Sequence, residues 1–469
     1  MSNSKGIKRN ISITMLVQVI SFTVSLIMNL FLPKYISVIE YSYWQTFLLY
    51  VAYIPLLHFG FPGGLLLHYA QYDYENIDKP LIRSLFTVFF VVELFFSVVI
   101  VIISRFVEND VAKTILLFMA ITVVLNNVFL YTSYTFQLTN RISKYAILIL
   151  CERLVLGVGV VFLIILNKTS LINILCIYTG ASVAANLWGY YNNKDLYFGS
   201  VVPIKKTLTH LKKILSSGIM LLIAALSSNF IVGGAKMVIQ WHYDALLFGQ
   251  LSFAFSVSNL FLSFVAAASI ALFPSIKRIE QEKLPYFYES IRKKVSVLLF
   301  VVLFFYFPGC KILQLWLPNY SGGLIYLGIL MPIIVFSSKV TLLTDNYLKA
   351  YRREKLMFCI NVISVTFAFS TYLVCVYLLD NLTALFFSLI AVVMLKSIVS
   401  EFFVMKLINK NFSRDFIVEF FMTIVFIFST MNFSLLYGGV IYLIVLICFV
   451  IWKTDFVEIK ERLKMSLHR

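Results

Sequence analysis

The stretch HFGFPGGLLLHYA, residues 58–70, ends a long apolar run and holds three glycines and a proline within five residues, 60–64. Glycine and proline both interrupt helices, so the stretch predicts a break. One interpretation is that an apolar helix simply ends by Gly60. The other is a broken helix inside a membrane, where irregular backbone is tolerated if it lines a cavity or packs on protein. Two of the chain's five histidines, His58 and His68, flank the break.

Composition places the rest of the chain in a membrane. The sequence is 61% hydrophobic and 13% charged, and its mean hydropathy is +0.91. A soluble domain is about 45–50% apolar and about 25% charged. The chain is therefore expected to be an all-α polytopic membrane protein.

Apolar runs of about 17–25 residues, each long enough to cross a bilayer, predict 14 spans. Twelve spans plus a short hairpin is the alternative, because the last two runs are short. The expected spans are 11–32, 42–66, 84–104, 113–135, 146–166, 171–191, 215–238, 246–272, 295–315, 322–344, 356–379, 382–405, 416–432 and 435–452.

The basic residues orient these spans. With a cytoplasmic N-terminus, the loops on that side hold 30 of the 39 Lys and Arg residues, and the opposite loops hold five. Such asymmetry follows the positive-inside rule, so both termini are expected in the cytoplasm. The same rule accounts for the formal charge of +17 without a nucleic-acid partner.

The loops also suggest how the chain divides. The basic stretch 194–214 separates the first twelve spans into two sets of six. We expect a central cavity between two six-helix bundles. The predicted segments are an N-terminal lobe at 1–193, a cytoplasmic linker at 194–214, a C-terminal lobe at 215–410, and a two-helix hairpin with a basic tail at 411–469.

Ionisable residues within spans are candidate functional residues, because burial in lipid is costly without a partner or water. Basic residues outnumber acidic ones by four to two in this set, which favours an anionic cargo. The set comprises Glu93, Glu152, Arg153, Lys236, Lys339 and Lys396.

Structural roles compete with functional ones at each of these positions. The lysines can snorkel to an interface, although Lys339 and Lys396 lie deeper and are expected to face the cavity. Neighbours on a helix do not face each other, so Glu152 and Arg153 are expected to pair with other helices. Glu93 either carries a coupling proton or balances a lysine.

Catalytic and cofactor sites are not expected. The sequence contains no nucleotide-binding GxxxxGK[ST] motif, no GxSxG, no HExxH and no metal-spaced cluster. The six cysteines all fall in apolar runs and are interpreted as packing residues. A membrane enzyme would need a large outer loop, and the longest expected one has about ten residues.

Several motifs resemble the polysaccharide-export (O-antigen flippase) proteins of the multidrug/oligosaccharidyl-lipid/polysaccharide exporter (MOP) superfamily. The first hairpin, LPKYISVIEYSYWQTFLLYVAYIPLLHFGFPGGLLLHYA (32–70), follows their order of Leu-Pro turn, Glu-Tyr-Gly, apolar helix and Gly-Phe break. Here Ser42 replaces the Gly, Gly63 a usual Asp and His68 a usual Arg. Further similar stretches are QLTNRISKYA (137–146), SSGIMLLIAALSSNFIVGGAKMVIQ (216–240), LFPSIKRIEQE (272–282), ILQLWLPNYSGG (312–323) and LKAYRREKL (348–356).

The resemblance implies a flippase of the bacterial inner membrane that translocates an undecaprenyl-pyrophosphate-linked oligosaccharide for O-antigen (lipopolysaccharide) or capsule assembly. Its cationic cavity is expected to use Lys339, Lys396, Lys236 and Arg153, with His68 and Arg83 at the cytoplasmic mouth. By analogy with lipid II flippases, the last two spans are expected to form a lipid groove. Membrane lipid, a polysaccharide polymerase and a chain-length regulator are candidate partners.

The flippase interpretation predicts the effect of two substitutions and can be compared with one rival function. Alanine at Lys339 or Lys396 is expected to abolish surface polysaccharide without changing protein abundance. The rival function is an ion-coupled multidrug or toxin extruder of the same superfamily. It would need a membrane-embedded carboxylate in each lobe, and the acids considered, Glu93 and Glu152, both fall in the N-terminal half.

Overall fold

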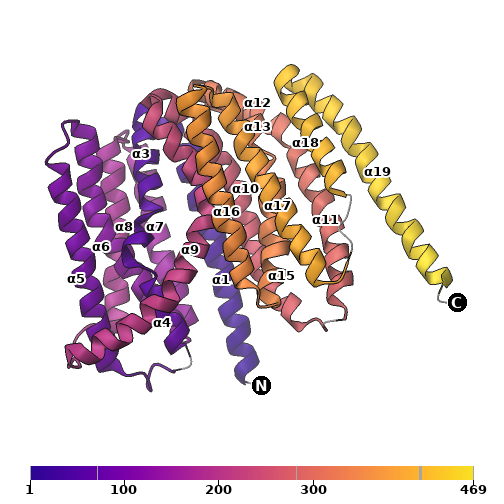
Figure 1. Cartoon of the computed structure of the whole chain (residues 1–469). Coiled ribbons are helices and arrows are strands. Elements are labelled where there is room, and N and C mark those ends of the chain that lie inside the picture. The colour runs from indigo at the N-terminus through magenta and orange to yellow at the C-terminus, as the bar shows by residue number, and fades with distance from the viewer. Residues whose placement is uncertain (1, 71, 281, 411–414, 468–469) are drawn as a thin grey trace. The chain divides into compact units, whose positions relative to one another are not determined.

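A computed structural model describes the course of residues 2–70, 72–280, 282–410 and 415–467. In these ranges the regular elements are all helical. The expected junction at 411–414 and the last two residues of the expected tail lie outside the described residues. The chain divides into two compact units, Met1–Asn229 (unit 1) and Phe230–Arg469 (unit 2), which are coloured along the chain in Figure 1.

Unit 1 contains the first eight α-helices and the first part of α9. Its elements are α1 (Ser2–Leu26), η1 (Ile27–Phe31), α2 (Leu32–Tyr35), α3 (Val38–Val51), η2 (Ile54–His58), α4 (Phe61–Tyr69), α5 (Lys79–Ser104), α6 (Asp110–Leu138), α7 (Ile142–Ile165), α8 (Leu171–Asn193), η3 (Lys194–Leu196) and α9 (Ile204–His242). In Figure 1, α5, α6 and α8 run side by side.

Unit 2 contains the remaining part of α9 and ten further α-helices. Its elements are α10 (Ala245–Arg278), α11 (Leu284–Phe304), α12 (Tyr306–Trp316), η4 (Pro318–Tyr320), α13 (Ser321–Leu330), α14 (Ile333–Lys339), η5 (Val340–Thr344), α15 (Asp345–Ala350), α16 (Glu354–Leu373), η6 (Val374–Leu378), α17 (Leu382–Leu407), α18 (Asp415–Asn432) and α19 (Leu435–Leu467). The α18–α19 hairpin packs against α11, α12 and α13.

Polar side chains mark where several of these helices begin. Each accepts a hydrogen bond from a backbone N–H of the first turn, which has no partner within the helix. Ser37 with Glu40 has the residue pattern of a capping box. The capping residues are Ser37, Asp78, Asn109, Ser170, Asp244 and Asn381.

Eleven described helices are long and apolar enough to cross a membrane, or up to 13 spans if each of two bent pairs counts as one. The chain is therefore a multi-pass membrane protein. All of these spans overlap expected ones. The remaining expected span, 215–238, lies within α9, so the total of 14 stays a prediction.

The two bent pairs are broken for local reasons. Val38–His58 and Phe61–Tyr69 meet at 51°, because Phe59 and Gly60 have left-handed φ values of 51° and 80°. Pro318–Leu330 and Ile333–Ala350 meet at 45°, where Pro332 precedes α14. The predicted break at residues 58–70 is therefore present, and a helix continues beyond it at Phe61–Tyr69. That this pair forms one broken span stays a prediction.

The expected linker differs in part from the structure. Residues 204–214 are not a loop, because α9 already begins at Ile204 and continues without interruption to His242. The boundary between the units falls inside this helix, between Asn229 and Phe230. The first two-thirds of α9 therefore belong with unit 1 and the last third with unit 2.

Candidate functional site

Three basic and three acidic side chains form one buried ion cluster in unit 2. They come from five helices, α11, α14, α17, α18 and α19. The members of the ion cluster are Arg292, Lys339, Glu401, Asp415, Glu419 and Lys453.

Lys339 lies between the two glutamates of the ion cluster. Its Nζ is 3.0 Å from Glu401 Oε2 and 2.5 Å from Glu419 Oε2. Arg292 donates to Glu401 and, at 2.5 Å, to Asp415 Oδ2, and Lys453 Nζ is 2.8 Å from the same Asp415 oxygen. The three positive and three negative charges balance, as burial of charged groups requires.

The structure gives Lys339 partners that the sequence did not suggest. The side chain is only 4% exposed, and two carboxylates already compensate its charge. Its role in binding an anionic cargo stays a prediction. Glu401 and Glu419 also lie inside expected spans, and the expected surplus of basic groups left these two acids out.

The sequence carried the signal for these two acids. Glu401 falls within the expected span 382–405 and Glu419 within 416–432, so the rule that selected Glu93 selects them too. Arg292 was not selected because it lies between the expected spans 246–272 and 295–315, whereas α11 already begins at Leu284.

Two other candidate cations in unit 2 have different surroundings. Lys396 on α17 is buried and forms no ion pair within 4.0 Å with the residues that the structure describes, although it interacts electrostatically with Asp345. Lys236 on α9 is half-buried, with Nζ 5.9 Å from the ring centroid of Phe255. Both remain candidates for binding an anionic group.

Glu152 and Arg153 in α7 interact with each other as well as with a neighbouring helix. Arg153 Nε is 4.0 Å from Glu152 Oε2, so the expectation that these neighbours do not meet is wrong. Ser182 of α8 donates to Glu152 Oε1 at 3.5 Å, in agreement with the expected partner on another helix. The arginine side chain is 41% exposed.

His68 contacts α9. Its Nε2 lies 2.9 Å from Ser217 Oγ and 3.3 Å from the Lys213 carbonyl oxygen. The neighbouring Tyr69 hydroxyl is 2.9 Å from His210 Nδ1. His68 therefore links α4 to α9 through hydrogen bonds. The sequence had suggested only that it binds cargo at the cytoplasmic mouth.

Arg83 likewise holds the chain's own backbone. Its Nε donates to the Asp195 carbonyl oxygen at 2.7 Å and its guanidinium to the Ser200 carbonyl oxygen at 3.1 Å. The Tyr74 hydroxyl donates to Asp195 Oδ2 at 3.3 Å. Burial raises the pKa of Tyr74 above its usual value, although the positive charge of Arg141 acts to lower it. The Tyr74 hydroxyl therefore keeps its proton and donates at neutral pH.

Replacement of His68 separates its structural contact from its charge. Leucine at position 68 removes the bond to Ser217 and is expected to cost about 1 kcal/mol of stability, whereas arginine can donate to the same oxygens. The midpoint of thermal unfolding in detergent should fall for His68→Leu and stay near wild type for His68→Arg. Equal midpoints for wild type and His68→Leu would show that the contact contributes nothing.

Glu93 is buried in the middle of α5 beside α6. Asn127 Nδ2 donates to Glu93 Oε2 at 2.5 Å, and both side chains are fully buried. Glu93 forms no ion pair with any residue that the structure describes, so no lysine balances its charge there. Within the described ranges, the second carboxylate oxygen has no hydrogen-bond partner.

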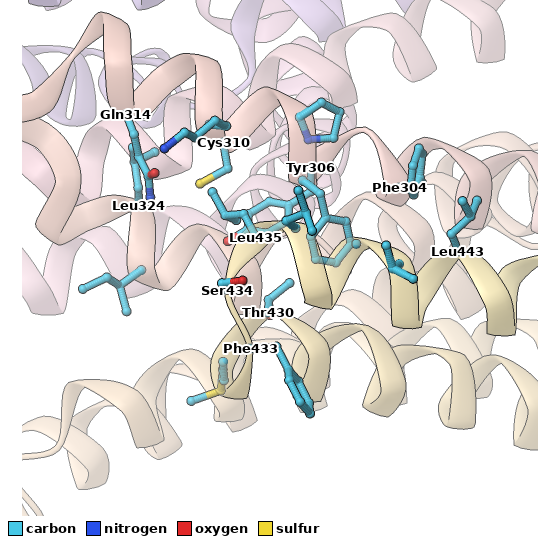
Figure 2. A pocket seen from close by; sticks show the side chains of 18 residues that line it. Phe304, Tyr306, Cys310, Gln314, Leu324, Thr430, Phe433, Ser434, Leu435 and Leu443 are labelled. Atoms are coloured by element: carbon cyan, nitrogen blue, oxygen red, sulfur yellow. The ribbon is translucent and has the colours of Figure 1, made fainter.

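An apolar pocket of about 940 Å³ lies in unit 2 between α12, α13 and the α18–α19 hairpin. Figure 2 shows the side chains of Gln314, Thr430 and Ser434 among apolar and aromatic ones. The walls include Phe304, Phe307, Leu324, Phe433, Leu435 and Leu443. Such a pocket suits an apolar chain with a few polar groups.

In the described part of the chain, no group of three or more His, Cys, Asp or Glu side chains could hold a metal ion. The arrangement instead offers buried cations, a buried acid and an apolar pocket. These are groups that bind charged and apolar parts of a ligand.

No protein-family model matches the chain, and no curated protein sequence does. Solved structures do match. The lipid II flippase MurJ in an inward closed conformation aligns with a TM-score of 0.65 at 12% identity, over 95% of this chain and 99% of that one. An inward-facing multidrug resistance MATE family transporter of the MOP superfamily aligns with a TM-score of 0.60 at 13% identity, over 85% and 97%.

A third match is a MOP superfamily transporter from Pyrococcus furiosus, whose binding pocket of reverse polarity suggests a different function for that protein. It aligns with a TM-score of 0.52 at 13% identity, over 86% of this chain and 96% of that one. Identities this low establish the fold alone. The chain has the fold of the MOP-superfamily exporters and flippases, the superfamily that its motifs resemble.

Proposed function

We propose that this protein is a flippase that moves an undecaprenyl-pyrophosphate-linked oligosaccharide, an O-antigen or capsule repeat unit, across the bacterial inner membrane. Transport occurs by alternating access, with both termini in the cytoplasm. The distribution of basic residues supports this orientation.

The observation that carries the proposal is the extent of the fold likeness. The MurJ alignment covers 95% of this chain, whereas the MATE alignment covers 85%. The alignment with MurJ therefore includes 10% of the chain that the alignment with the MATE transporter leaves out (95 minus 85). MurJ is a flippase for a lipid-linked molecule.

The pocket beside α18 and α19 supports a lipid-linked cargo as well. Its walls are mainly aromatic and aliphatic, and the exposed Lys311 is among its lining residues. The prenyl chain of the substrate, or a membrane lipid, can bury apolar surface there.

Lys396 and Lys236 are the proposed contacts for the pyrophosphate. Both belong to unit 2, and neither takes part in the ion cluster. Charge-assisted hydrogen bonds from lysine to phosphate oxygens are strong in a site of low dielectric. The proposed contacts do not include Lys339, His68 or Arg83, because their polar groups bind within the protein.

A multidrug extruder is the alternative, and the uncompensated Glu93 is the observation that favours it. Glu401 and Glu419 of unit 2 are already paired with Arg292 and Lys339. These two carboxylates therefore do not favour a site for cationic drugs in unit 2. An extruder would therefore have to bind its cation in unit 1.

Lys396 gives a direct test of the anion site. Lys396→Met keeps the length of the side chain but removes its charge, and a lost charge-assisted bond of about 1.5–3 kcal/mol corresponds to about a 10- to 100-fold loss of transport. Surface polysaccharide should fall accordingly in a strain that depends on this protein, while membrane abundance stays normal and Lys396→Arg retains function.

The control for this variant is Lys168→Met, which removes an exposed lysine between α7 and α8 and should leave polysaccharide unchanged. Normal polysaccharide in the Lys396→Met strain would remove Lys396 from the proposed site.

Reconstitution tests the function itself. Liposomes containing the purified protein and a defined, labelled undecaprenyl-pyrophosphate oligosaccharide should expose the glycan to a membrane-impermeant reagent faster than empty liposomes do. A cationic dye in parallel liposomes tests the alternative. Transport of the dye without movement of the glycan would overturn the flippase proposal.

A further inference from the structure

The Glu93–Asn127 pair in unit 1 leaves two acceptor oxygens without donors. Asn127 Nδ2 donates to Glu93 Oε2, but Glu93 Oε1 and Asn127 Oδ1 have no hydrogen-bond partner among the residues that the structure describes. Glu93 is the fifteenth of 26 residues in α5 and lies far from either end of its span. Buried polar atoms are nearly always bonded, so two orphan oxygens in one buried pair require an explanation.

Neighbouring titratable groups do not supply the missing partner. His58 Nδ1 accepts from the Gly60 N–H, the Tyr131 hydroxyl donates to the Ile82 carbonyl oxygen, and Asp195 lies 3.6 Å from Lys79. The titratable groups on α6, η2 and η3, which pack against α5, are Asp110, Lys113, Tyr131, Tyr134, His58, Lys194 and Asp195. Helix α4, whose Phe61 stacks on Phe89, adds His68 and Tyr69, and Tyr197 packs against Phe86.

A proton is the ligand that this pair suits. An unpaired carboxylate in a buried apolar site is strongly disfavoured, and such a group takes up a proton instead. A proton on Oε1 removes the charge and makes this oxygen a hydrogen-bond donor, which leaves Asn127 Oδ1 as an acceptor for it. Hard metal cations need about six oxygen ligands, and the pair offers two.

Aromatic rings lie one helical turn away from both members of the pair. Phe89 precedes Glu93 by one turn of α5, and Tyr131 follows Asn127 by one turn of α6. Phe61, the first residue of helix α4, stacks on Phe89 at 4.8 Å and on Tyr131 at 6.3 Å between ring centroids. All three rings are buried. Residues one turn apart share a helix face, so movement of α4 would remove Phe61 from the rings on the same faces as the pair.

We propose that Glu93 and Asn127 form a proton-binding site in unit 1, beside the rings of Phe61, Phe89 and Tyr131, and that the binding and release of this proton accompany transport. The carboxyl takes the proton from solution on Oε1 and returns it to solution as the carboxylate forms again. Coupling to transport rests on the proposed function, whereas proton binding does not.

Infrared difference spectroscopy of the full-length protein in liposomes tests proton binding without any substrate. As pH rises, wild type should lose the carbonyl band of a buried carboxylic acid, and Glu93→Gln should lack this change. Glu152→Gln is the matched control, because it alters the other buried acid of unit 1 and should retain the band. Phe61→Ala should accelerate deuterium exchange at the carboxyl, while Phe95→Ala, at an exposed ring, should not.

Three results would overturn the site. The band could persist in Glu93→Gln, it could belong to Glu93 yet ignore pH, or it could shift with sodium at constant pH, which would indicate a metal cation. If the site holds, a pH gradient should change the rate of glycan transport by wild type but not by Glu93→Gln. Equal responses of the two proteins would overturn the coupling. Absence of any glycan transport by wild type would count against the proposed function and leave the spectroscopic result standing.

Discussion

Replacing Lys339 by methionine is expected to reduce the amount of folded protein sharply. The change leaves Glu401 and Glu419, both about 1% exposed, with one positive charge too few. Removal of one partner from a buried ion pair costs about 3–5 kcal/mol. Membrane abundance and the thermal unfolding midpoint in detergent should both fall. This reverses the expectation from sequence, in which activity is lost at normal abundance.

Two variants serve as controls for the Lys339 experiment. Lys396→Met removes a lysine outside the ion cluster and should leave abundance normal. Lys339→Met combined with Glu419→Gln removes one charge of each sign, keeps an acceptor for the Ser296 hydroxyl that bonds Glu419 at 2.9 Å, and should recover part of the lost stability. If Lys339→Met alone melts like wild type, the ion cluster does not stabilise unit 2.

Alanine at Gly64 is the second substitution with a large expected effect. A Cβ atom there would lie 2.1 Å from the Ile214 carbonyl oxygen, and a Cβ at Gly218 would lie 2.1 Å from the Gly60 carbonyl oxygen. Each substitution must push α4 and α9 apart, which opens the buried cluster that includes Leu65 and Ile214. Overpacking typically costs about 1–3 kcal/mol, so the unfolding midpoints should fall for both.

The chain offers the same Gly-to-Ala change at sites without this contact. A Cβ at Gly63 would meet only the Leu221 side chain at 3.6 Å, and one at Gly180 would meet nothing within 4 Å. Both variants should match or exceed wild-type stability, since alanine favours helix over glycine. If Gly64→Ala and Gly180→Ala behave alike, the close approach of α4 and α9 is not limiting.

The break at residues 58–60 shows what local sequence can predict and what it cannot. Glycine and proline at 60–64 were sufficient to predict that the helix breaks, because backbone freedom at Gly60 is a property of the residue itself. The local sequence could not show why a glycine is required at position 64. Its partner, Ile214, lies 150 positions further along the chain, in a stretch expected to be a loop.

The candidate site shows the same division. Sequence alone determined that the chain crosses a membrane many times, where most spans lie and which ionisable residues fall within them, because hydropathy and charge are properties of each segment. Only the tertiary structure decided which charges are paired. Lys339 meets Glu401 and Glu419 from 62 and 80 positions away, whereas Glu93 meets only an amide. Pairing depends on how each helix is rotated about its axis and packed on its neighbours, and no single segment of the sequence records that rotation.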